Sequence, residues 1–284
     1  MRLADLPWLS GPPVPRIFGD YQAMRRDYLI DEYLAAARPE GVVKSVYVQT
    51  NWPPARHLEE VAWVQSVADR HGFPHAIVGF ADLSWPDVGA RLDAMRAHPN
   101  LRGIRQQLHW HPRELYRFAP RPDMMNDPAW RRGLGEVGQR GLLFELQVFA
   151  GQMADSARLA RDHPDLTFVL MHAGMLEDRS PEGWARWRAG MGALAGCPNV
   201  SVKLSGLGTF EHRCATELWR PVVEETLAMF GAHRCMFGSN VPVEMLWARY
   251  HEIVAVTGEC LSGLSALEQR AVWHDTAARI YRLN

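Results

Sequence analysis

Short apolar runs alternate with longer segments of helical periodicity along most of this chain. Each run is rich in branched aliphatic or aromatic residues and ends at glycine or polar residues, which is typical of a buried strand. Strands that alternate with helices in this way form parallel βαβ units. The predicted strands are residues 42–49, 75–80, 103–108, 142–148, 166–172, 200–204 and 235–239.

This alternation predicts an α/β fold of the TIM-barrel type, in which helices surround a closed parallel sheet. A (β/α)8 barrel needs eight strands and the sequence supplies seven, so its first strand is missing or atypical. Residues 1–27 contain several prolines and aromatic side chains but no strand pattern, and we expect an irregular lead-in there. No linker or repeat interrupts residues 1–284, which predicts a single barrel domain.

The segments between the predicted strands carry the helical pattern. The final one opens with Ser265 and Glu268, whose spacing is that of a capping box at the start of a helix. The helices expected with the clearest bounds are residues 55–71, 87–97, 130–139 and 265–281.

The charge balance narrows the classes of partner. The chain has 31 basic and 32 acidic residues and a formal net charge of −1, so no basic excess favours nucleic acid or an anionic membrane. No charged and then apolar leader and no run of about 18 apolar residues is found. The four cysteines lack C-x-x-C spacing, which favours reduced thiols. We expect a cytoplasmic protein with a small-molecule partner, and a homo-oligomer is left open.

Polar side chains follow several predicted strands at their carboxyl ends, the face on which barrel enzymes keep their chemistry. Arg105, Gln107 and His109 alternate along one extended segment, so they should share one face. The other candidates are Gln147 after the strand at 142–148, His172 at the end of the strand at 166–172, Lys203 within the strand at 200–204, and, more weakly, Gln49 and Asn51.

Arg105 and Lys203 are the cations of this set. The planar guanidinium of an arginine can grip a substrate carboxylate with two hydrogen bonds, but it can also pair with a carboxylate of the barrel itself. A lysine inside a barrel must likewise be paired or contact an anionic ligand, because its isolated charge would be unfavourable there. Both readings stay open for both residues.

The last predicted strand runs into Gly238-Ser239-Asn240-Val241-Pro242. This motif resembles the Gly-Ser-Asp and Pro that end the last strand in the lactonase-like branch of the amidohydrolase superfamily. Leu6-Pro-Trp-Leu9 is similar to the turn that follows the first strand of that family, and 274–282 is similar to its last helix. His172 resembles a sixth-strand histidine that the superfamily uses as a metal ligand or to polarise a carbonyl group.

The first-strand His-x-His of that family has no counterpart before residue 57. Either the start codon is placed too late, or the barrel closes in another way. His109 and His111 have the right spacing but follow a different strand, so we expect that match to be accidental. Only His172 then matches a ligand of the family, and one histidine does not hold zinc. We therefore expect no metal, the family alternative being one divalent ion such as zinc.

The resemblance implies a hydrolase that opens a lactone or related carboxyl ester of a small acidic or sugar-acid metabolite. In that reading His172 polarises the carbonyl group, Arg105 anchors a substrate carboxylate, and Asn240 orients the water or stabilises the oxyanion. Gln107, Gln147, Lys203 and His109 would complete the substrate site. Two alternatives stay open: a lactone isomerase of the same family, and a barrel that binds a ligand without converting it.

Overall fold

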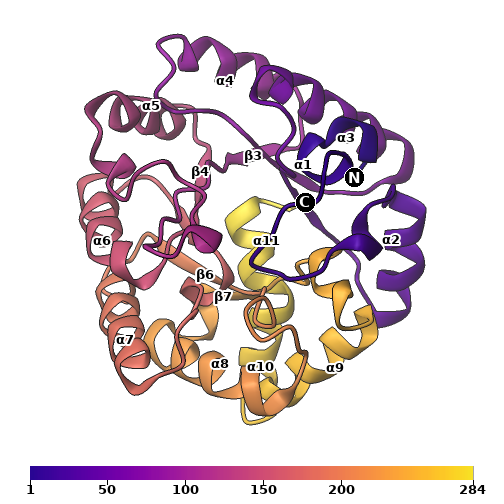
Figure 1. The fold of residues 1–284 in the computed structure, drawn as a ribbon, viewed down its shortest axis with the longest axis vertical. Coiled ribbons are helices and arrows are strands. Elements are labelled where there is room, and N and C mark those ends of the chain that lie inside the picture. Colours follow the sequence, from indigo (N-terminus) through magenta and orange to yellow (C-terminus); the bar gives the residue numbers. More distant parts are fainter. Residues whose placement is uncertain (284) are drawn as a thin grey trace.

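The computed structural model describes residues 1–283. One sheet of parallel strands runs in sequence order from β1 to β7, and helices lie around it in a ring (Figure 1). This arrangement confirms the predicted α/β barrel architecture with one strand missing. The strands are β1 (Val46–Val48), β2 (Ala76–Gly79), β3 (Leu101–Ile104), β4 (Leu143–Leu146), β5 (Phe168–Leu170), β6 (Val200–Leu204) and β7 (Cys235–Phe237).

Helices connect each strand to the next, as the alternating pattern predicts. The segment expected as one helix over 265–281 consists of α10, a π-helix at Ala271–Asp275 and α11, and Ser265 and Glu268 form the predicted capping box. The helices are α1 (Pro7–Ser10), α2 (Ile30–Ala37), α3 (His57–His71), α4 (Val88–Arg96), α5 (Pro128–Gln139), α6 (Met153–Asp162), α7 (Pro181–Ala195), α8 (Thr216–Phe230), α9 (Tyr250–Leu261), α10 (Ala266–Arg270) and α11 (Thr276–Tyr281).

The main hydrophobic core lies between the sheet and the surrounding helices. Trp130 of α5 packs edge-to-face on Phe144 of β4, and Phe144 packs in the same way on Phe168 of β5. These rings are fully buried, and burying such large apolar side chains supplies most of the driving force for folding. Strands β2, β4, β5 and β6 are buried on both faces, which explains why they appear in the sequence as continuous apolar runs, whereas β1 beside the seam is only half-buried.

The sheet does not close on itself. Strand β1 pairs only with β2, and β7 pairs only with β6, so a seam separates β1 from β7. The helix α11 lies near the middle of the ring in Figure 1, and Tyr281 at its end is fully buried against the barrel interior. The seam lies where an eighth strand would complete the barrel.

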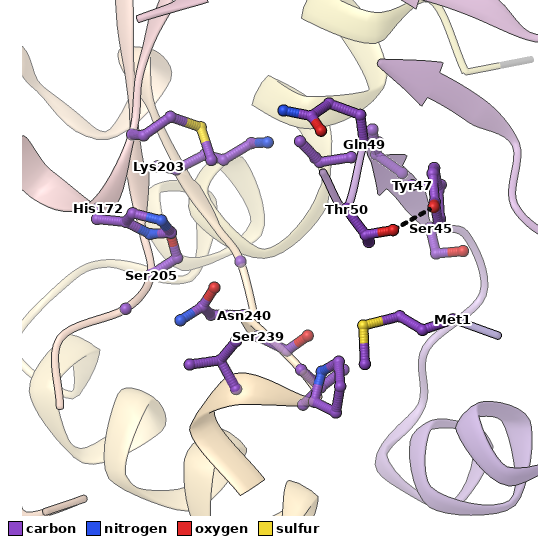
Figure 2. Close-up of a pocket in the computed structure, with 18 of the residues that line it drawn as sticks. Met1, Ser45, Tyr47, Gln49, Thr50, His172, Lys203, Ser205, Ser239 and Asn240 are labelled. Atoms are coloured by element: carbon purple, nitrogen blue, oxygen red, sulfur yellow. Dashed lines mark hydrogen bonds between the residues drawn. The ribbon is translucent and has the colours of Figure 1, made fainter. Parts of the chain in front are cut away.

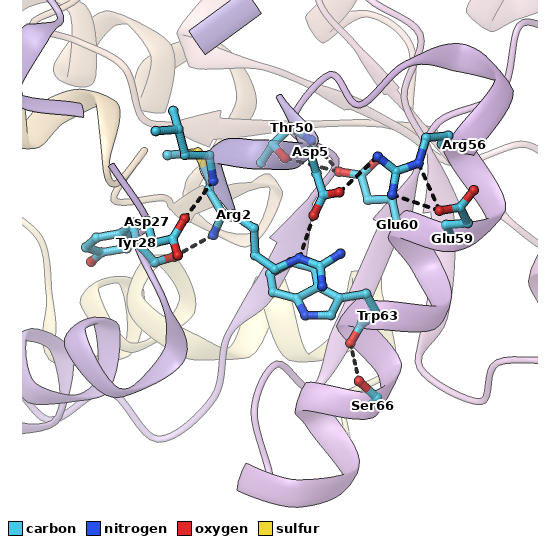
Figure 3. A network of polar contacts seen from close by, with 12 residues as sticks. Arg2, Asp5, Asp27, Tyr28, Thr50, Arg56, Glu59, Glu60, Trp63 and Ser66 are labelled. Atoms are coloured by element: carbon cyan, nitrogen blue, oxygen red, sulfur yellow. Dashed lines mark hydrogen bonds and ion pairs between the residues drawn. The ribbon is translucent and has the colours of Figure 1, made fainter. Parts of the chain in front are cut away.

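Residues 1–27 form the irregular lead-in that the sequence predicts, with short helical turns and no strand. Their aromatic side chains pack on one another, as Trp8, Phe18 and Tyr21 show. Polar contacts also fix the segment, because Asp5 pairs with Arg56 at 2.9 Å next to α3 (Figure 3). No helix within residues 1–283 has the length and apolar character needed to cross a bilayer.

Candidate active site

A cavity of about 1480 Å³ opens at the carboxyl ends of the strands and continues along the seam between β1 and β7. Figure 2 shows His172, Lys203 and Ser205 on one side and Tyr47, Gln49 and Thr50 of the β1 region on the other, with Ser239 and Asn240 below them. The predicted site residues all line it: Arg105, Gln107, His109, Gln147, His172, Lys203 and Asn240. The structure therefore brings together side chains that five different strands position.

Arg105 follows β3 and is 9% exposed. Its Nη2 donates to the Gln49 carbonyl oxygen at 2.6 Å and its Nη1 to Gln147 Oε1 at 3.4 Å, while Nε has no partner. No carboxylate of residues 1–283 forms an ion pair with it. Burial lowers the pKa of Arg105, an effect that the more distant charges of Glu145 and Glu60 oppose. The guanidinium is thus a buried cation held by neutral groups and open to a cavity.

The segment after β3 stays extended beyond the strand itself. Arg105 N donates to the Gly79 carbonyl at 2.8 Å, and Leu108 N donates to the Gln147 carbonyl at 3.3 Å. These irregular bonds explain why the strand predicted over 103–108 is observed only as Leu101–Ile104. The alternation nevertheless holds, because Gln107 also reaches the cavity and donates to Gln147 Oε1 at 3.4 Å.

Lys203 lies inside the barrel on β6, and its Nζ donates to Glu145 Oε1 of β4 at 2.5 Å. The same oxygen accepts the Tyr281 hydroxyl at 2.6 Å. Burial lowers the pKa of Lys203, and Glu145 counteracts that shift. Of the two readings that the sequence left open, the internal ion pair is the one that the structure shows.

His172 follows β5, and its ring is open to the cavity on one side. Its Nδ1 lies 2.9 Å from Ser205 Oγ. Burial, with the charges of Arg105 and Lys203, lowers the pKa of His172 to about 3, so the ring is neutral at physiological pH. Gly206 is required beside it, because a Cβ there would stand 2.6 Å from His172 Nδ1.

His109 and His111 lie near an aromatic cluster of the loop after β3. The ring of His109 stacks on Phe118 at 5.3 Å, and burial together with Arg105 lowers the pKa of His109 to about 3. His111 instead faces Glu177, with 3.7 Å between His111 Nε2 and Glu177 Oε1, and does not line the cavity. The structure places His109 in the candidate site and His111 outside it.

Asn240 follows β7 with φ of 53°, in the left-handed region that asparagine tolerates. Its Nδ2 donates to Glu244 Oε2 at 3.0 Å. Glu244 is 1% exposed, and burial raises the pKa of its carboxyl to about 7. Glu244 and Glu145 were not predicted from the sequence; an acidic residue inside an apolar run was the available signal for Glu145.

Known proteins resemble this chain over nearly its full length. An uncharacterized protein of Sinorhizobium fredii, y4mH, is 42% identical and covers 98% of this chain and 93% of its own. The L-fucono-1,5-lactonase of Burkholderia multivorans is 31% identical over 99% of this chain and 92% of its own. The crystal structure of a Burkholderia multivorans amidohydrolase with bound zinc has a TM-score of 0.83, 28% identity, and coverage of 100% and 95%.

Zinc in that crystal structure raises the question of whether the present residues could hold it. Within residues 1–283, no three His, Cys, Asp or Glu side chains gather as a metal site would need. Ser205 hydrogen-bonds to Nδ1 of His172, the Lys203 side chain lies on the same side of the cavity, and Asn240 lies below them (Figure 2). A zinc site takes three or four anionic or imidazole donors, so these residues do not fit one.

The part of the chain that forms the barrel and its cavity is also the part that matches a known family. The Amidohydrolase family profile matches residues 6–283, which is nearly the whole chain. The similarity to the L-fucono-1,5-lactonase of Burkholderia multivorans likewise extends over almost the full length of both chains. The chain therefore belongs to the amidohydrolase family and to its lactonase-like branch.

Proposed function

We propose that this protein is a hydrolase that opens the lactone ring of a small acidic or sugar-derived metabolite. The observation that carries the proposal is Arg105, a buried guanidinium that faces the cavity without a carboxylate partner. Such a cation is suited to an acidic ligand, because a bidentate contact with a carboxylate supplies the missing charge. The relative named as an L-fucono-1,5-lactonase supports a lactone as the reacting group.

The neutral state of His172 also supports this function. When the Ser205 hydroxyl donates to Nδ1, the proton of the ring is on Nε2 and can be donated to the carbonyl oxygen of a lactone. Because the pKa of His172 is about 3, this donor stays neutral and does not titrate near physiological pH. A hydrogen bond that strengthens as the carbonyl oxygen becomes negative stabilises the transition state.

Asn240 would hold the water that attacks. The water oxygen forms a bond to the carbonyl carbon, the bond from that carbon to the ring oxygen breaks, and the proton lost by the water ends on the ring oxygen. The products of lactone and water are therefore one hydroxy acid. Asn240→Leu removes the amide with little change of volume, and we expect it to lower turnover by about 10²-fold.

Lactone isomerisation is the second candidate, and the residue that favours it is again Asn240. An amide cannot take a proton as the Asp of related lactonases could, whereas a substrate hydroxyl held near the carbonyl group needs less activation. The test is an NMR time course with sugar-acid and dicarboxylic-acid lactones. Free hydroxy acid supports hydrolysis, a second lactone of the same acid supports isomerisation, and no change with any lactone contradicts both.

We further propose that the protein acts without a bound metal, since its cavity residues do not fit a zinc site. Elemental analysis of the purified protein should find well under one zinc or manganese per chain, and a chelator should leave turnover unchanged. One metal per chain that disappears in His172→Ala would contradict this proposal.

A further inference from the structure

A buried carboxyl group lies directly behind Asn240. Glu244 belongs to a short 3-10 helix, Val243–Leu246, that follows the Asn240 loop. Its Oε2 accepts the side-chain amide of Asn240 at 3.0 Å, and its Oε1 accepts the backbone N–H of Gly208 at 2.8 Å. The backbone joins the same two residues, since Glu244 N donates to the Asn240 carbonyl at 3.1 Å. Glu244 itself does not line the cavity.

The contact with Gly208 fixes the direction of the other hydrogen bond. A backbone N–H can only donate, so Glu244 Oε1 must accept from it. The site is tight, because a Cβ on Gly208 would stand 2.8 Å from that oxygen. An ionised carboxylate has no proton to donate, and the remaining oxygen must therefore also accept. The side-chain amide of Asn240, whose nitrogen lies 3.0 Å from Oε2, and the indole N–H of Trp247 are the side-chain donors beside this carboxylate.

We propose that Glu244 is a positioning residue that sets the polarity of Asn240, holding the amide nitrogen so that the carbonyl oxygen Oδ1 is presented to the cavity. Asn240 then acts as an acceptor for the attacking water or for a hydroxyl of the ligand, and oxyanion stabilisation falls to His172. The inference deepens the proposed function and rests on it for the identity of the ligand. Of the two roles considered for Asn240, it retains orientation of the water and excludes stabilisation of the oxyanion.

The hydrogen-bond donors described around Glu244 are uncharged. The loop after β6 contributes the Gly208 N–H, the residue after the short helix contributes the Trp247 indole N–H, and the segment before α8 contributes the Cys214 thiol. The ring of His212 lies 5.7 Å from that of Trp247. No Lys, Arg or His of residues 1–283 forms an ion pair with the carboxylate. This isolation is consistent with the pKa of about 7 that burial gives Glu244.

Protonation of Glu244 reverses the arrangement. The protonated Oε2 becomes a donor, and the amide of Asn240 must rotate so that Oδ1 accepts from it and the nitrogen faces the cavity. Glu244→Gln imposes the same reversal at every pH, because the glutamine oxygen must stay on the Gly208 N–H and its nitrogen then faces Asn240. E244Q should therefore resemble the acid form of the wild-type protein.

The first test uses thermal unfolding and needs no substrate. Asn240→Asp places two carboxyl groups about 3 Å apart where only one can ionise freely. We expect N240D to melt below the wild type at pH 8 and close to it at pH 5. Adding Glu244→Gln should restore the melting temperature at pH 8, since the glutamine nitrogen can donate to Asp. If E244Q fails to rescue N240D at pH 8, Glu244 does not face residue 240 as an acceptor and the proposal is wrong.

The pH dependence of the melting temperature, compared between the wild type and E244Q, is an independent check on the buried carboxyl group. The folded pKa of about 7 exceeds the ordinary 4.5, so the native state binds more protons between these values and its stability falls as pH rises through them. The melting temperature of the wild type should drop relative to E244Q by roughly 5 °C between pH 4.5 and 8. Parallel curves for the two proteins would count against an isolated buried carboxyl.

The second test uses turnover of whichever lactone the wild type converts. We expect kcat/KM of the wild type to fall about tenfold or more as pH drops below 7, and E244Q to show that low value without the inflection. A wild-type inflection that persists in E244Q overturns the positioning role even if N240D is rescued. If no lactone is converted at all, the proposed function fails, whereas the unfolding experiments still decide how Glu244 and Asn240 are paired.

Discussion

Lys203 and Arg105 are buried cations in the same cavity, yet the protein satisfies them in different ways. Lys203 has an internal counter-ion, Glu145, at 2.5 Å, and that carboxylate is held in turn by Tyr281. Within the described residues, Arg105 donates hydrogen bonds to an amide oxygen and a backbone carbonyl and has no carboxylate partner. A charge that the protein neutralises contributes to the fold, whereas a charge that it leaves without a counter-ion is available to a ligand.

The largest effect should come from breaking the Lys203 pair. Lys203→Met leaves Glu145 buried with a hydroxyl as its remaining partner, and we expect the free energy of unfolding to fall by about 3–5 kcal/mol. Chemical denaturation at pH 7 measures this loss. The double variant with Glu145→Gln is the control, because removing both charges should recover much of the stability. A loss below about 1 kcal/mol would mean that the pair is not structural.

Arg105→Met should weaken ligand binding and leave stability nearly unchanged, the opposite of what we expect for Lys203→Met. Affinity for an acidic lactone, or for the acid that it yields, should weaken by about 1.5–3 kcal/mol, while the melting temperature changes little. Calorimetric titration measures the affinity. Arg105→Lys keeps the charge but loses the planar fork, so its affinity should lie between those of the wild type and Arg105→Met. A variant that unfolds while ligand affinity is unchanged would place Arg105 among the structural residues.

Giving Arg105 a counter-ion should make it resemble Lys203. Gln147→Glu replaces the amide oxygen that lies 3.4 Å from Arg105 Nη1 with a carboxylate. The new ion pair would compete with an anionic ligand, so we expect about tenfold weaker binding with unchanged or higher stability. Affinity for a neutral lactone serves as the control and should change less. Equal affinity for the acidic ligand would contradict the role of Arg105 as its anchor.

Tyr281→Phe is the mildest perturbation of the Lys203 side. It removes the hydroxyl that donates to Glu145 but keeps the aromatic ring, whose centroid lies 5.2 Å from Lys203 Nζ. We expect a loss of about 0.5–1.5 kcal/mol in the free energy of unfolding, and no change in ligand affinity. A larger effect on binding than on stability would show that the Lys203–Glu145 pair is coupled to the ligand site at Arg105.

The sequence predicted the architecture because alternating buried strands and helices leave few ways to pack. It also predicted which strand ends face the cavity, including His172 and Asn240, since side-chain alternation and strand polarity decide this. The roles of these residues stay predictions. The partner of Lys203 was not predictable, because Glu145 and Lys203 are 58 positions apart and meet only through the curvature of the sheet.

Glu244 shows a different limit. It follows Asn240 by four residues, so the motif at 238–242 could have been read further. Its importance, however, comes from burial and from the N–H of Gly208 in the preceding loop, neither of which is visible in a linear pattern. Strand β3 is shorter than predicted for a similar reason, because the extended segment after it continues through irregular hydrogen bonds to two neighbouring strands.

The contact between Tyr281 and Glu145 also bears on the order in which the chain assembles during synthesis. The two residues are 136 positions apart, so the hydroxyl that shares Glu145 Oε1 with Lys203 emerges from the ribosome long after β4 does. Until α11 is made, β4 and β6 can bring Glu145 and Lys203 together only in a barrel whose interior is still open to water along the seam. Contacts between residues this distant slow folding, and the interior of the barrel is therefore completed late.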